Sequence, residues 1–460
     1  MWKAAGNTAG AVQAVSSAVG SVNTIQRSSW RAVPGRQVTD RQFIQGTEME
    51  VYISMKFAQE NNRTIPTADK VFALSGRAKA AAKKYGDENV VNASLGALMD
   101  DNGKLAVLSS VIDAIRKLEP TDYAEYAPIG GTPEFKEAVK KALFGKYTPE
   151  GYVSMCATPG GTGSISNVIM NYSQPGDQIL THDWCWANYK NICSQHGRSL
   201  ATFQFFDEEG NFNGADLAAK IQEIGSKQDS LVVMINTPAH NPTGYSLSLE
   251  DWDAVIEAVN AAPCKVALFM DIAYIDYAGD EDEVRAFLPK LAGVNDNVLP
   301  IFGYSASKTL TAYGMRCGAI VCLAKDEETA EEFRRVTEYA ARATWSNCNR
   351  SAQVVMGKIY SDPELLAKVD AERTVFRDML LERGRAFEEA LNAKGCKCVP
   401  FRAGFFVTVA CDDPAAICAE LEKQNIFCLA LARGIRISIA GISKEKCIRT
   451  ANALGDLLNK

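Results

Sequence analysis

The fold is decided by three stretches of the chain, Leu231-Val-Val-Met-Ile235, Val266-Ala-Leu-Phe-Met270 and Val298-Leu-Pro-Ile-Phe302. Each is a near-continuous run of apolar residues, whereas a strand with one face in water alternates apolar and polar residues. Continuous runs of this length are typical of strands that are buried on both faces of a mostly parallel sheet. The chain is therefore predicted to have an α/β fold.

Two further runs, at residues 178–180 and 317–323, extend the predicted sheet. Residues 249–262 lie between two of the strands and carry apolar residues at helical spacing, with Ser246 and Ser248 as candidate N-caps. This succession predicts strand–helix–strand units with helices on both faces of the sheet. In such sheets ligands bind beyond the carboxyl ends of the strands, so the residues that come after each run are the candidates for chemistry.

A second, smaller α+β region is predicted towards the C-terminus. A long charged amphipathic helix at residues 363–394 ends before Gly395, and the strand-like stretches 398–409 and 426–439 come after it among helical patterns. The length of the helix indicates a connector between domains. The predicted division is a leader at 1–48, the first part of a small domain at 49–106, a large domain at 107–374 and the rest of the small domain at 375–460.

Length and composition exclude several classes of protein. The chain has 460 residues, of which 47% are hydrophobic and 23% are charged, as in soluble globular proteins. The formal net charge of −6 gives no basic excess for a nucleic acid partner. The thirteen cysteines include no CxxC pair and the three histidines form no HExxH motif, so no metal site is predicted.

The N-terminal stretch differs from the rest of the chain. Residues 1–39 contain no Asp or Glu, while they include four basic residues and many serines. This composition is typical of a transit peptide, and the alternative is a disordered arm. If the leader is a targeting signal, the predicted location of the protein is the matrix of a mitochondrion or another organelle. Otherwise the predicted location is the cytoplasm. It contains no uncharged apolar run of the ~18 residues that a membrane span needs, so no membrane association is predicted.

Two loops carry residues suited to an anion and to a reactive amine. The loop Thr158-Pro-Gly-Gly-Thr-Gly-Ser164 leads into a predicted helix at 165–172, where backbone N–H groups and the helix dipole favour a phosphate. Ser305-Ala-Ser-Lys308 comes after the third strand, with Arg316 eight residues later. A lysine at the end of a buried strand is expected to have a depressed pKa, as an amine nucleophile requires. The alternatives are an ordinary glycine-rich turn and a surface lysine.

Asp271 and Tyr274 come after the second strand in the segment Met270-Asp-Ile-Ala-Tyr274. A carboxylate at this position can keep a pyridine nitrogen protonated through a charge-assisted hydrogen bond, and a tyrosine hydroxyl can meet a phenolate. The alternative interpretation is a helix cap and a core aromatic residue.

Together these motifs resemble the class I aspartate and aromatic aminotransferases, over about residues 90 to 445. The motifs that carry the resemblance are, in order, Leu95-Gly-Ala97, Asp100-Asp-Asn-Gly-Lys104, Tyr126-Ala-Pro-Ile-Gly-Gly131, Trp186-Ala-Asn188, His240-Asn-Pro-Thr-Gly244, Asp271 to Tyr274, Ser305 to Lys308 with Arg316, and Arg436-Ile-Ser-Ile-Ala-Gly441. The resemblance implies a fold-type I transferase that depends on pyridoxal 5′-phosphate. Its fold has a large, mostly parallel seven-stranded sheet domain and a smaller α+β domain, and its homodimer shares active sites between subunits.

The resemblance also implies roles for individual residues. Lys308 would hold the cofactor as a Schiff base and then move the proton between the substrate and the cofactor. The other cofactor residues would be Asp271 at the ring nitrogen, Asn241 and Tyr274 at the ring oxygen, Trp186 stacked on the ring, and Gly161, Thr162, Ser305, Arg316 and the partner subunit's Tyr126 at the phosphate. The substrate residues would be Arg436 at the α-carboxylate, Arg342 reaching across the dimer to a side-chain carboxylate, and Gly96, Asn241 and Trp186 around them.

The expected function is transamination between an acidic or aromatic L-amino acid and a 2-oxo acid such as 2-oxoglutarate, by a ping-pong route through pyridoxamine phosphate. The alternatives are another fold-type I reaction, such as β-elimination or decarboxylation, and a protein that uses the fold only for binding. The chain departs from the family pattern at three positions. Gly160 lacks a hydroxyl for the phosphate, and Trp345 stands where tyrosine is more common. Tyr189 replaces a histidine that usually supports the aspartate, which leaves the hydrogen-bond support of Asp271 open.

Overall fold

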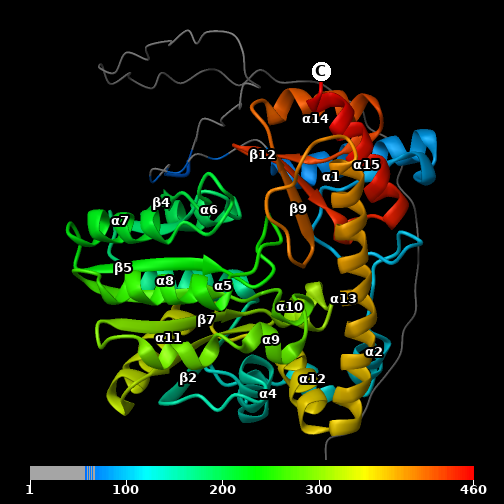
Figure 1. Ribbon diagram of the computed structural model, residues 1–460. Helices are drawn as coiled ribbons and strands as arrows, with labels where there is room; N and C mark the ends of the chain where they lie inside the picture. The colour runs from blue at the N-terminus through cyan, green and yellow to red at the C-terminus, as the bar shows by residue number, and fades with distance from the viewer. Residues whose placement is uncertain (1–56, 60, 62, 64, 66–67) are drawn as a thin grey trace, which may run out of the picture. The chain divides into compact units, whose positions relative to one another are not determined.

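A large sheet lies at the centre of the computed structural model, which describes residues 57–59, 61, 63, 65 and 68–460 (Figure 1). Within these residues seven strands form this sheet in the order β2-β8-β7-β6-β5-β3-β4. The strands are β2 (Tyr152–Thr158), β3 (Gln178–His182), β4 (Ser199–Phe203), β5 (Ser230–Asn236), β6 (Lys265–Asp271), β7 (Val298–Tyr304) and β8 (Gly318–Ala324). The predicted leader at 1–48 lies outside the described residues.

The direction of β8 brings two loops together. β8 pairs antiparallel with both β2 and β7, whereas the remaining pairs in the sheet are parallel. The amino end of β8 therefore lies at the same edge of the sheet as the carboxyl ends of its neighbours. The register sets Thr158 opposite Gly318 and Tyr304 opposite Ala319. As a result, the glycine-rich loop, the segment after β7 and the residues just before β8 meet at one edge.

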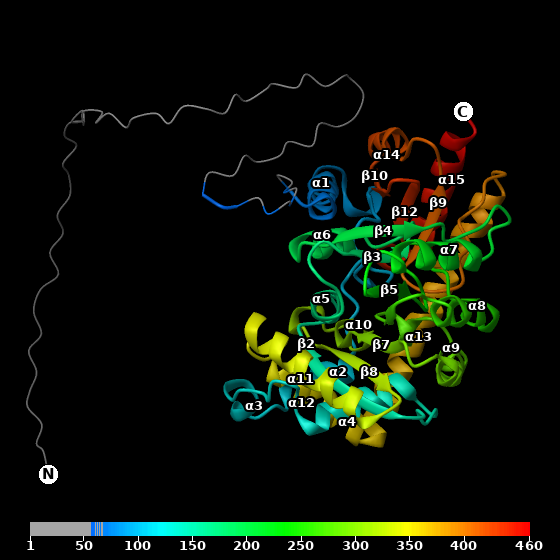
Figure 2. The same ribbon diagram turned by 90° about the vertical axis from the view of Figure 1, so that its left-hand side faces the viewer.

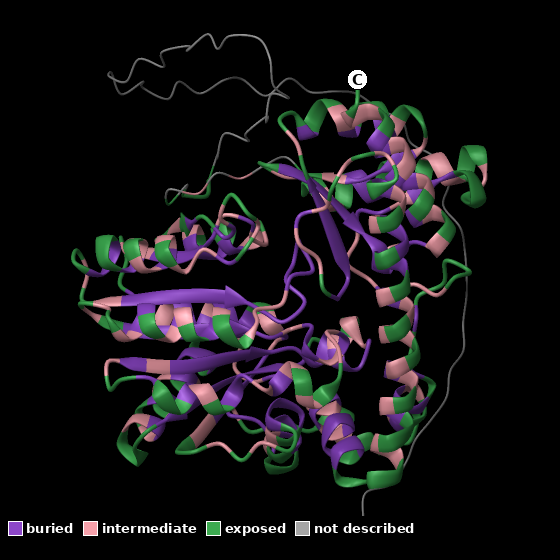
Figure 3. Cartoon of the chain, viewed as in Figure 1, coloured by how far each residue is buried: buried purple, intermediate pink, exposed green. Residues whose placement is uncertain are grey.

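Helices cover both faces of the sheet because its strands are apolar on both faces. Leu231, Val233 and Ile235 of β5 pack with residues of α7 and α8, while Val232 and Met234 pack with residues of α5 and α6 on the other face. These helices are α5 (Gly161–Asn171), α6 (Asn188–Gln195), α7 (Gly214–Gly225) and α8 (Leu249–Asn260). The two pairs lie on opposite sides of the strands in Figure 2, and Figure 3 shows the strands largely buried while the helices carry exposed outer faces.

The predicted elements agree closely with those observed. The five apolar runs are β3, β5, β6, β7 and β8, each longer by a few residues or shifted by one. The helix predicted at 249–262 is α8, and Ser248 rather than Ser246 is its N-cap, because the Ser248 side chain accepts from the Asp251 N–H. The prediction had no strand at β2 or β4, which are the two edges of the sheet.

Two smaller sheets lie beside helix α13. One contains β11, β12 and β9 in antiparallel pairs, and the other pairs β1 with β10 in parallel. The strands are β1 (Val91–Asn92), β9 (Phe406–Ala410), β10 (Ile426–Phe427), β11 (Leu429–Ala430) and β12 (Gly434–Ser438). Helices α1 (Lys70–Tyr85), α14 (Pro414–Lys423) and α15 (Lys444–Leu458) pack around them. Because β1 pairs with β10, a segment from before the large sheet takes part in this C-terminal region. The predicted domain boundaries stay a prediction.

Helix α13 (Pro363–Asn392) is the helix predicted at 363–394. Its 30 residues span about 45 Å at the usual rise per residue. Near its C-terminal end the buried guanidinium of Arg383 donates to the carbonyl oxygens of Met99 (3.1 Å), Ile439 (3.3 Å) and Ala440 (3.3 Å) and to the carboxylate of Asp101 (2.7 Å). This one side chain therefore links α13 to the loop after β1 and to the turn after β12.

The remaining elements connect these parts. They are α2 (Ser109–Arg116), α3 (Pro120–Ala124), α4 (Pro133–Phe144), α9 (Glu281–Arg285), α10 (Ala306–Thr309), α11 (Glu327–Thr344), α12 (Arg350–Ser361) and the 3-10 helices η1 (Asp87–Asn89), η2 (Ile275–Tyr277), η3 (Leu288–Gly293), η4 (Tyr313–Met315) and η5 (Ile439–Gly441). All thirteen cysteines are free thiols. Among the described residues, no helix combines the length and apolar character that crossing a bilayer requires.

The contact between β8 and the loops beside it predicts that Gly318→Ala destabilises the fold. A Cβ at Gly318 would lie 2.5 Å from the Tyr304 carbonyl oxygen and 2.8 Å from the Gly160 carbonyl carbon, and neither backbone atom can rotate away. We expect a loss of about 1–3 kcal/mol in the free energy of unfolding, measured by urea denaturation of the cofactor-free protein. Gly314→Ala is the matched control, because a Cβ there meets nothing within 4 Å. Equal stabilities for the two variants would contradict the predicted clash.

Candidate active site

The residues predicted to do chemistry meet at the edge of the sheet where β6 and β7 end. Asp271 is the last residue of β6, and Ser305 comes directly after the last residue of β7. Lys308 lies in the one-turn helix α10, and Arg316 precedes β8 at the same edge. Asn241 lies in the loop after β5. The parallel strands therefore bring together residues that are up to 75 positions apart in the sequence, between Asn241 and Arg316.

Lys308 has an amine that is withdrawn from water. Its Nζ donates to the Gly96 carbonyl oxygen at 3.1 Å and lies 4.7 Å from the ring centroid of Tyr313, 5.4 Å from that of Tyr274 and 5.7 Å from that of Phe405. Burial lowers the pKa of Lys308 to about 8, and the positive charges of Arg316 and Arg436 contribute to this lowering against the pull of Asp271. A substantial share of the amine is therefore neutral near physiological pH, which is the state that reacts with a carbonyl group.

Asp271 has a hydrogen-bond donor that was not expected from the sequence. The hydroxyl of Tyr189, a fully buried residue at the start of α6, donates to Asp271 Oδ2 at 2.6 Å. Burial raises the pKa of Asp271, while the hydrogen bonds from Tyr189 and from the Ala273 N–H and the charge of Lys308 lower it. The support of Asp271, which the replacement of the family histidine had left open, is therefore provided by the tyrosine hydroxyl.

Arg436 is a buried cation without a carboxylate partner among the described residues. It lies in β12, 6% exposed, and its guanidinium donates to the Ser94 carbonyl oxygen at 2.7 Å and to Asn241 Oδ1 at 3.3 Å. Its Nε has no hydrogen-bond partner within the same part of the chain, and its guanidinium carbon lies 4.4 Å from the ring centroid of Phe406. Burial lowers the pKa of Arg436 to about 10, although Tyr274 raises it. A buried guanidinium with a spare donor and only neutral acceptors is suited to an incoming carboxylate.

Asn241 and Tyr274 lie between Asp271 and Arg436. The Asn241 backbone N–H donates to Asn236 Oδ1 at 2.8 Å, and the Asn236 amide donates to the Asp271 carbonyl oxygen at 2.7 Å, which fixes the loop after β5 to the end of β6. Tyr274 packs on Phe405, with ring centroids 5.0 Å apart. Burial raises the pKa of Tyr274, so its hydroxyl stays protonated and can donate to an oxyanion.

A second group of donors lies around Arg316. The Arg316 Nη1 donates to the Ser307 hydroxyl and to the Tyr313 carbonyl oxygen, both at 3.0 Å. A Cβ at Gly160, where φ is +74°, would lie 2.7 Å from Arg316 Nη2, so a side chain at the position predicted to lack a phosphate ligand would displace the Arg316 guanidinium. Gly161 begins helix α5, and a Cβ there would lie 3.5 Å from the Ser305 Cβ. Guanidinium, hydroxyl and helix N-terminal N–H groups are the donors that bind phosphate.

Three other predicted residues differ in whether they contact the residues around Lys308. Trp186 is half-buried, and its ring packs edge-on against Tyr189 with centroids 5.7 Å apart, so it lies next to the donor of Asp271. Tyr126 is 84% exposed, and Arg342, at the end of α11, is exposed and donates to the Ser346 hydroxyl at 2.5 Å. Within the part of the chain described, neither Tyr126 nor Arg342 hydrogen bonds to the residues around Lys308.

Four residues that shape the site were not predicted from the sequence. These are Tyr189 at Asp271, Tyr313 and Phe405 beside the Lys308 amine, and Phe406 over Arg436. Tyr313 lies between the two predicted residues Lys308 and Arg316, and that spacing could have indicated it. Phe405 and Phe406 lie just before and at the start of β9, about 100 positions after Lys308. Apolar residues in a strand are expected for the core, so nothing in the sequence marked these two as site residues.

The donor set fits pyridoxal 5′-phosphate at this site. Lys308 provides a partly neutral amine for its aldehyde, Asp271 a buried carboxylate for its ring nitrogen, and the Arg316 group a cradle for its phosphate. A side chain at Gly160 would displace the Arg316 guanidinium, whereas a Cβ at Gly161 would make only an ordinary contact with Ser305. The roles that the resemblance implies for these residues stay predictions.

Comparisons with known proteins give the family. Residues 88–454 match the family model of aminotransferase class I and II. The mitochondrial aspartate aminotransferase of Schizosaccharomyces pombe is 26% identical over 84% of this chain and 88% of that protein. The aromatic-amino-acid aminotransferase of Paracoccus denitrificans is 25% identical over 84% of this chain and 96% of its own length.

Solved structures show the same fold. An aminotransferase of Anaerococcus prevotii, 37% identical, superposes with a TM-score of 0.86 over 88% of this chain and all of that one. An aromatic-amino-acid aminotransferase of Burkholderia pseudomallei, covalently bound to pyridoxal phosphate, superposes with a TM-score of 0.72 at 22% identity, over 87% of this chain and all of that one. The large, mostly parallel sheet and the smaller sheets are therefore those of a fold-type I transferase, as predicted.

The hydrogen bond from Tyr189 predicts a pH-dependent defect in Tyr189→Phe. Loss of the hydroxyl removes an interaction that lowers the pKa of Asp271, so the carboxylate becomes protonated at a higher pH than in the wild type. We expect pyridoxal 5′-phosphate to bind the cofactor-free variant roughly tenfold more weakly near pH 6, with the acid midpoint of binding moved to higher pH. Titrations monitored by absorbance between pH 5 and 9 measure this midpoint.

Tyr172→Phe is the control for this substitution, because the Tyr172 hydroxyl is buried but has no hydrogen-bond partner to lose among the described residues. Its binding midpoint should match that of the wild type. An unchanged midpoint in Tyr189→Phe would show that Tyr189 does not support the charge of Asp271.

Proposed function

The chain belongs to the class I and II aminotransferases, and from this premise we propose that it transfers an amino group between an acidic or aromatic L-amino acid and a 2-oxo acid such as 2-oxoglutarate, in two half-reactions. The observation that carries this proposal is the Lys308 amine, which donates to the Gly96 carbonyl oxygen and is acted on by the charges of Asp271 and Arg436. The enzyme depends on pyridoxal 5′-phosphate, like its family.

The cofactor supplies an electron sink for the electrons of the bond that breaks at the substrate Cα. Asp271 keeps its negative charge beside the ring nitrogen through the Tyr189 hydrogen bond. Lys308 holds the cofactor through its amine and afterwards holds or releases a proton at Nζ, for which a pKa of about 8 is well matched. The surrounding rings of Tyr274, Tyr313 and Phe405 exclude water from that proton transfer.

Arg436 is proposed to orient the substrate. A carboxylate that accepts two hydrogen bonds from the guanidinium would satisfy the unpartnered Nε and fix the α-carbon relative to Lys308. Asn241 contacts the same guanidinium and limits its rotation. Gly96 has no room for a side chain, because a Cβ there would lie 2.7 Å from the Phe406 ring that covers Arg436.

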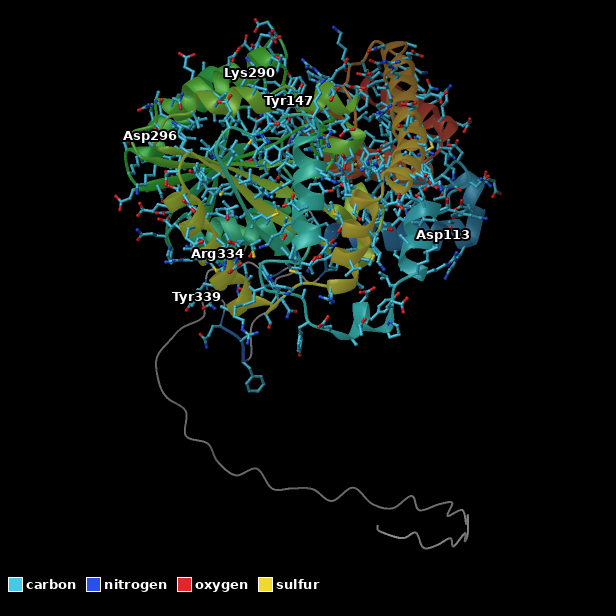
Figure 4. The ribbon with its side chains drawn as sticks, turned by 90° about the horizontal axis from the view of Figure 1, so that it is seen from below. Asp113, Tyr147, Lys290, Asp296, Arg334 and Tyr339 are labelled. Carbon is cyan, nitrogen blue, oxygen red and sulfur yellow. The ribbon has the colours of Figure 1, made fainter. Side chains whose placement is uncertain are left out.

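The proposed enzyme is a homodimer in which Tyr126 and Arg342 act in the partner's site. Tyr126 is 84% exposed and Tyr339 79% exposed, so a partner subunit that covered them would remove two large aromatic side chains from water. Tyr339 is an exposed residue of α11 (Figure 4), and Arg342 lies within one turn of it. If a neighbouring subunit covered this helix, the guanidinium of Arg342 would extend into the active site of that subunit.

The compartment is proposed from the leader. Relatives include mitochondrial and cytoplasmic aspartate aminotransferases, so the family itself is compatible with either. We propose that the acid-free stretch at 1–39 directs the chain to a mitochondrion or another organelle; without that role the enzyme would be cytoplasmic.

The first prediction from this proposal concerns Lys308. L-aspartate or L-phenylalanine added to the purified enzyme should convert the absorbance of the bound cofactor, and 2-oxoglutarate should restore it. Lys308→Ala should bind the cofactor without a covalent link and show no turnover, because the variant lacks the amine that holds and releases the proton. Absence of conversion with every common amino acid would refute transamination, and turnover by Lys308→Ala would refute the role of the lysine.

The second prediction concerns substrate choice. Arg342→Ala should lower kcat/KM for L-aspartate by roughly ten- to hundredfold, as expected for loss of one charge-assisted hydrogen bond pair, with little change for L-phenylalanine. Arg335→Ala is the control, because Arg335 is an exposed arginine of the same helix that pairs with Glu331. Equal losses for aspartate and phenylalanine would remove Arg342 from the recognition of acidic side chains.

A further inference from the structure

A buried ionic cluster lies behind Lys308, and none of its members is among the residues assigned above. We define the Asp276 cluster as Asp276, Arg285, Thr309 and Arg373. Asp276 Oδ1 accepts from Arg285 Nη2 at 2.9 Å. Its Oδ2 accepts from the Thr309 hydroxyl at 2.6 Å and lies 3.4 Å from Arg373 Nη1. The side chains of Asp276, Arg285 and Arg373 are 8%, 2% and 11% exposed.

The cluster joins four separate elements of the fold. Asp276 lies in η2, Arg285 at the end of α9, Thr309 at the end of α10 and Arg373 in α13. Arg285 also donates to the carbonyl oxygens of Ala142 (2.7 Å), Leu143 (3.2 Å) and Glu281 (3.1 Å), and Arg373 also pairs with Asp370. Both guanidiniums are thus held from several directions, and Asp276 is held by them.

The charge of Asp276 is maintained by its partners. Burial alone would raise the pKa of this carboxyl, but the adjacent Arg373 and Arg285 and the Thr309 hydroxyl outweigh burial and lower the pKa below its usual value. The group therefore stays ionised and remains a strong hydrogen-bond acceptor for Thr309. A hydrogen bond of this kind is stronger than one between two neutral groups.

The helix that carries Lys308 depends on such a contact. α10 has four residues, and its N-cap Ser305 makes no side-chain capping hydrogen bond. A helix of one turn is not stable by itself in water, so tertiary contacts must fix its orientation. Thr309 is the residue next to Lys308 and is 1% exposed. Its hydroxyl bond to Asp276 holds the buried side of α10, while Lys308 extends from the same turn into the site.

We propose that Asp276 is a positioning residue for Lys308, acting through its hydrogen bond with Thr309 and fixed in place by Arg285 and Arg373. This bond keeps the lysine amine at the Gly96 carbonyl and among the three aromatic rings. The alternative is that the cluster only stabilises the fold. The inference rests on the proposed function for its effect on turnover, but its effect on the lysine amine can be measured without any substrate.

Thr309→Val and Thr309→Ser form a matched pair that separates these alternatives. Valine keeps the shape of threonine and removes the hydroxyl, whereas serine keeps the hydroxyl. Competitive labelling of Lys308 with an amine reagent in the cofactor-free protein, analysed by mass spectrometry over pH 6 to 11, gives the pKa of its amine. Urea denaturation of both variants confirms that the protein measured is folded.

In Thr309→Val we expect the pKa of Lys308 to rise from about 8 towards the ordinary lysine value, because a loosened α10 lets the amine reach water. We expect kcat to fall about tenfold with KM changed less than about twofold, since the chemistry loses alignment while substrate binding does not. Thr309→Ser should restore both the pKa and kcat to near the wild-type values.

The proposal is overturned if Thr309→Val leaves the pKa of Lys308 unchanged, or if Thr309→Ser is impaired as severely as Thr309→Val. Asp276→Asn is a second variant that should reproduce the labelling change, although it leaves the buried Arg285 without a carboxylate and Arg373 with Asp370 alone, and therefore lowers the urea midpoint. If the wild type transfers no amino group, the proposed function fails, while the labelling result still decides the role of Asp276 in positioning the lysine.

Discussion

The Lys308 amine shares its surroundings with two guanidiniums and one carboxylate, and most of these charges are removed from water. Arg436 is buried against neutral acceptors, and Asp271 is the acidic side chain whose charge acts on the lysine. Removing a charge from water is costly unless an opposite charge is close. This cost favours a carboxylate at the buried Arg436, while the exposed guanidinium of Arg316 is the group proposed for the phosphate. The position of Arg316 follows from the direction of β8 in the large sheet, and that of Arg436 from its place in β12 of a smaller sheet.

The interior of the large sheet could be predicted from the sequence, but its edges could not. The five predicted strands are the interior ones, because only strands covered on both faces and both sides form continuous apolar runs. β2 and β4 are the edges, and polar residues such as Ser154 and Thr202 interrupt them. The antiparallel direction of β8 also leaves no mark in the composition of the strand, although it decides where Arg316 lies.

Within the site, sequence reasoning found residues that belong to motifs and missed those defined by contacts. Lys308, Asp271 and Arg436 lie in recognisable segments, and the fold brings them together. Tyr189 was noted only as a departure from a pattern, since nothing in the sequence shows that its hydroxyl reaches Asp271. Asp276 lies two residues beyond Tyr274, yet its partner Arg373 is almost a hundred positions away, so no local pattern could indicate the pair.

Helix α13 makes two contacts through arginines whose relative directions are set by the number of helical residues between them. Arg373 pairs with Asp276, and Arg383, ten residues later, contacts the segments that lead to Gly96 and Arg436. Each residue added to a helix rotates the remainder of that helix by about 100° and advances it by about 1.5 Å. A single insertion or deletion between these two arginines would point one of them away from its partners. Related chains that keep both contacts should therefore vary in sequence between these positions but not in length.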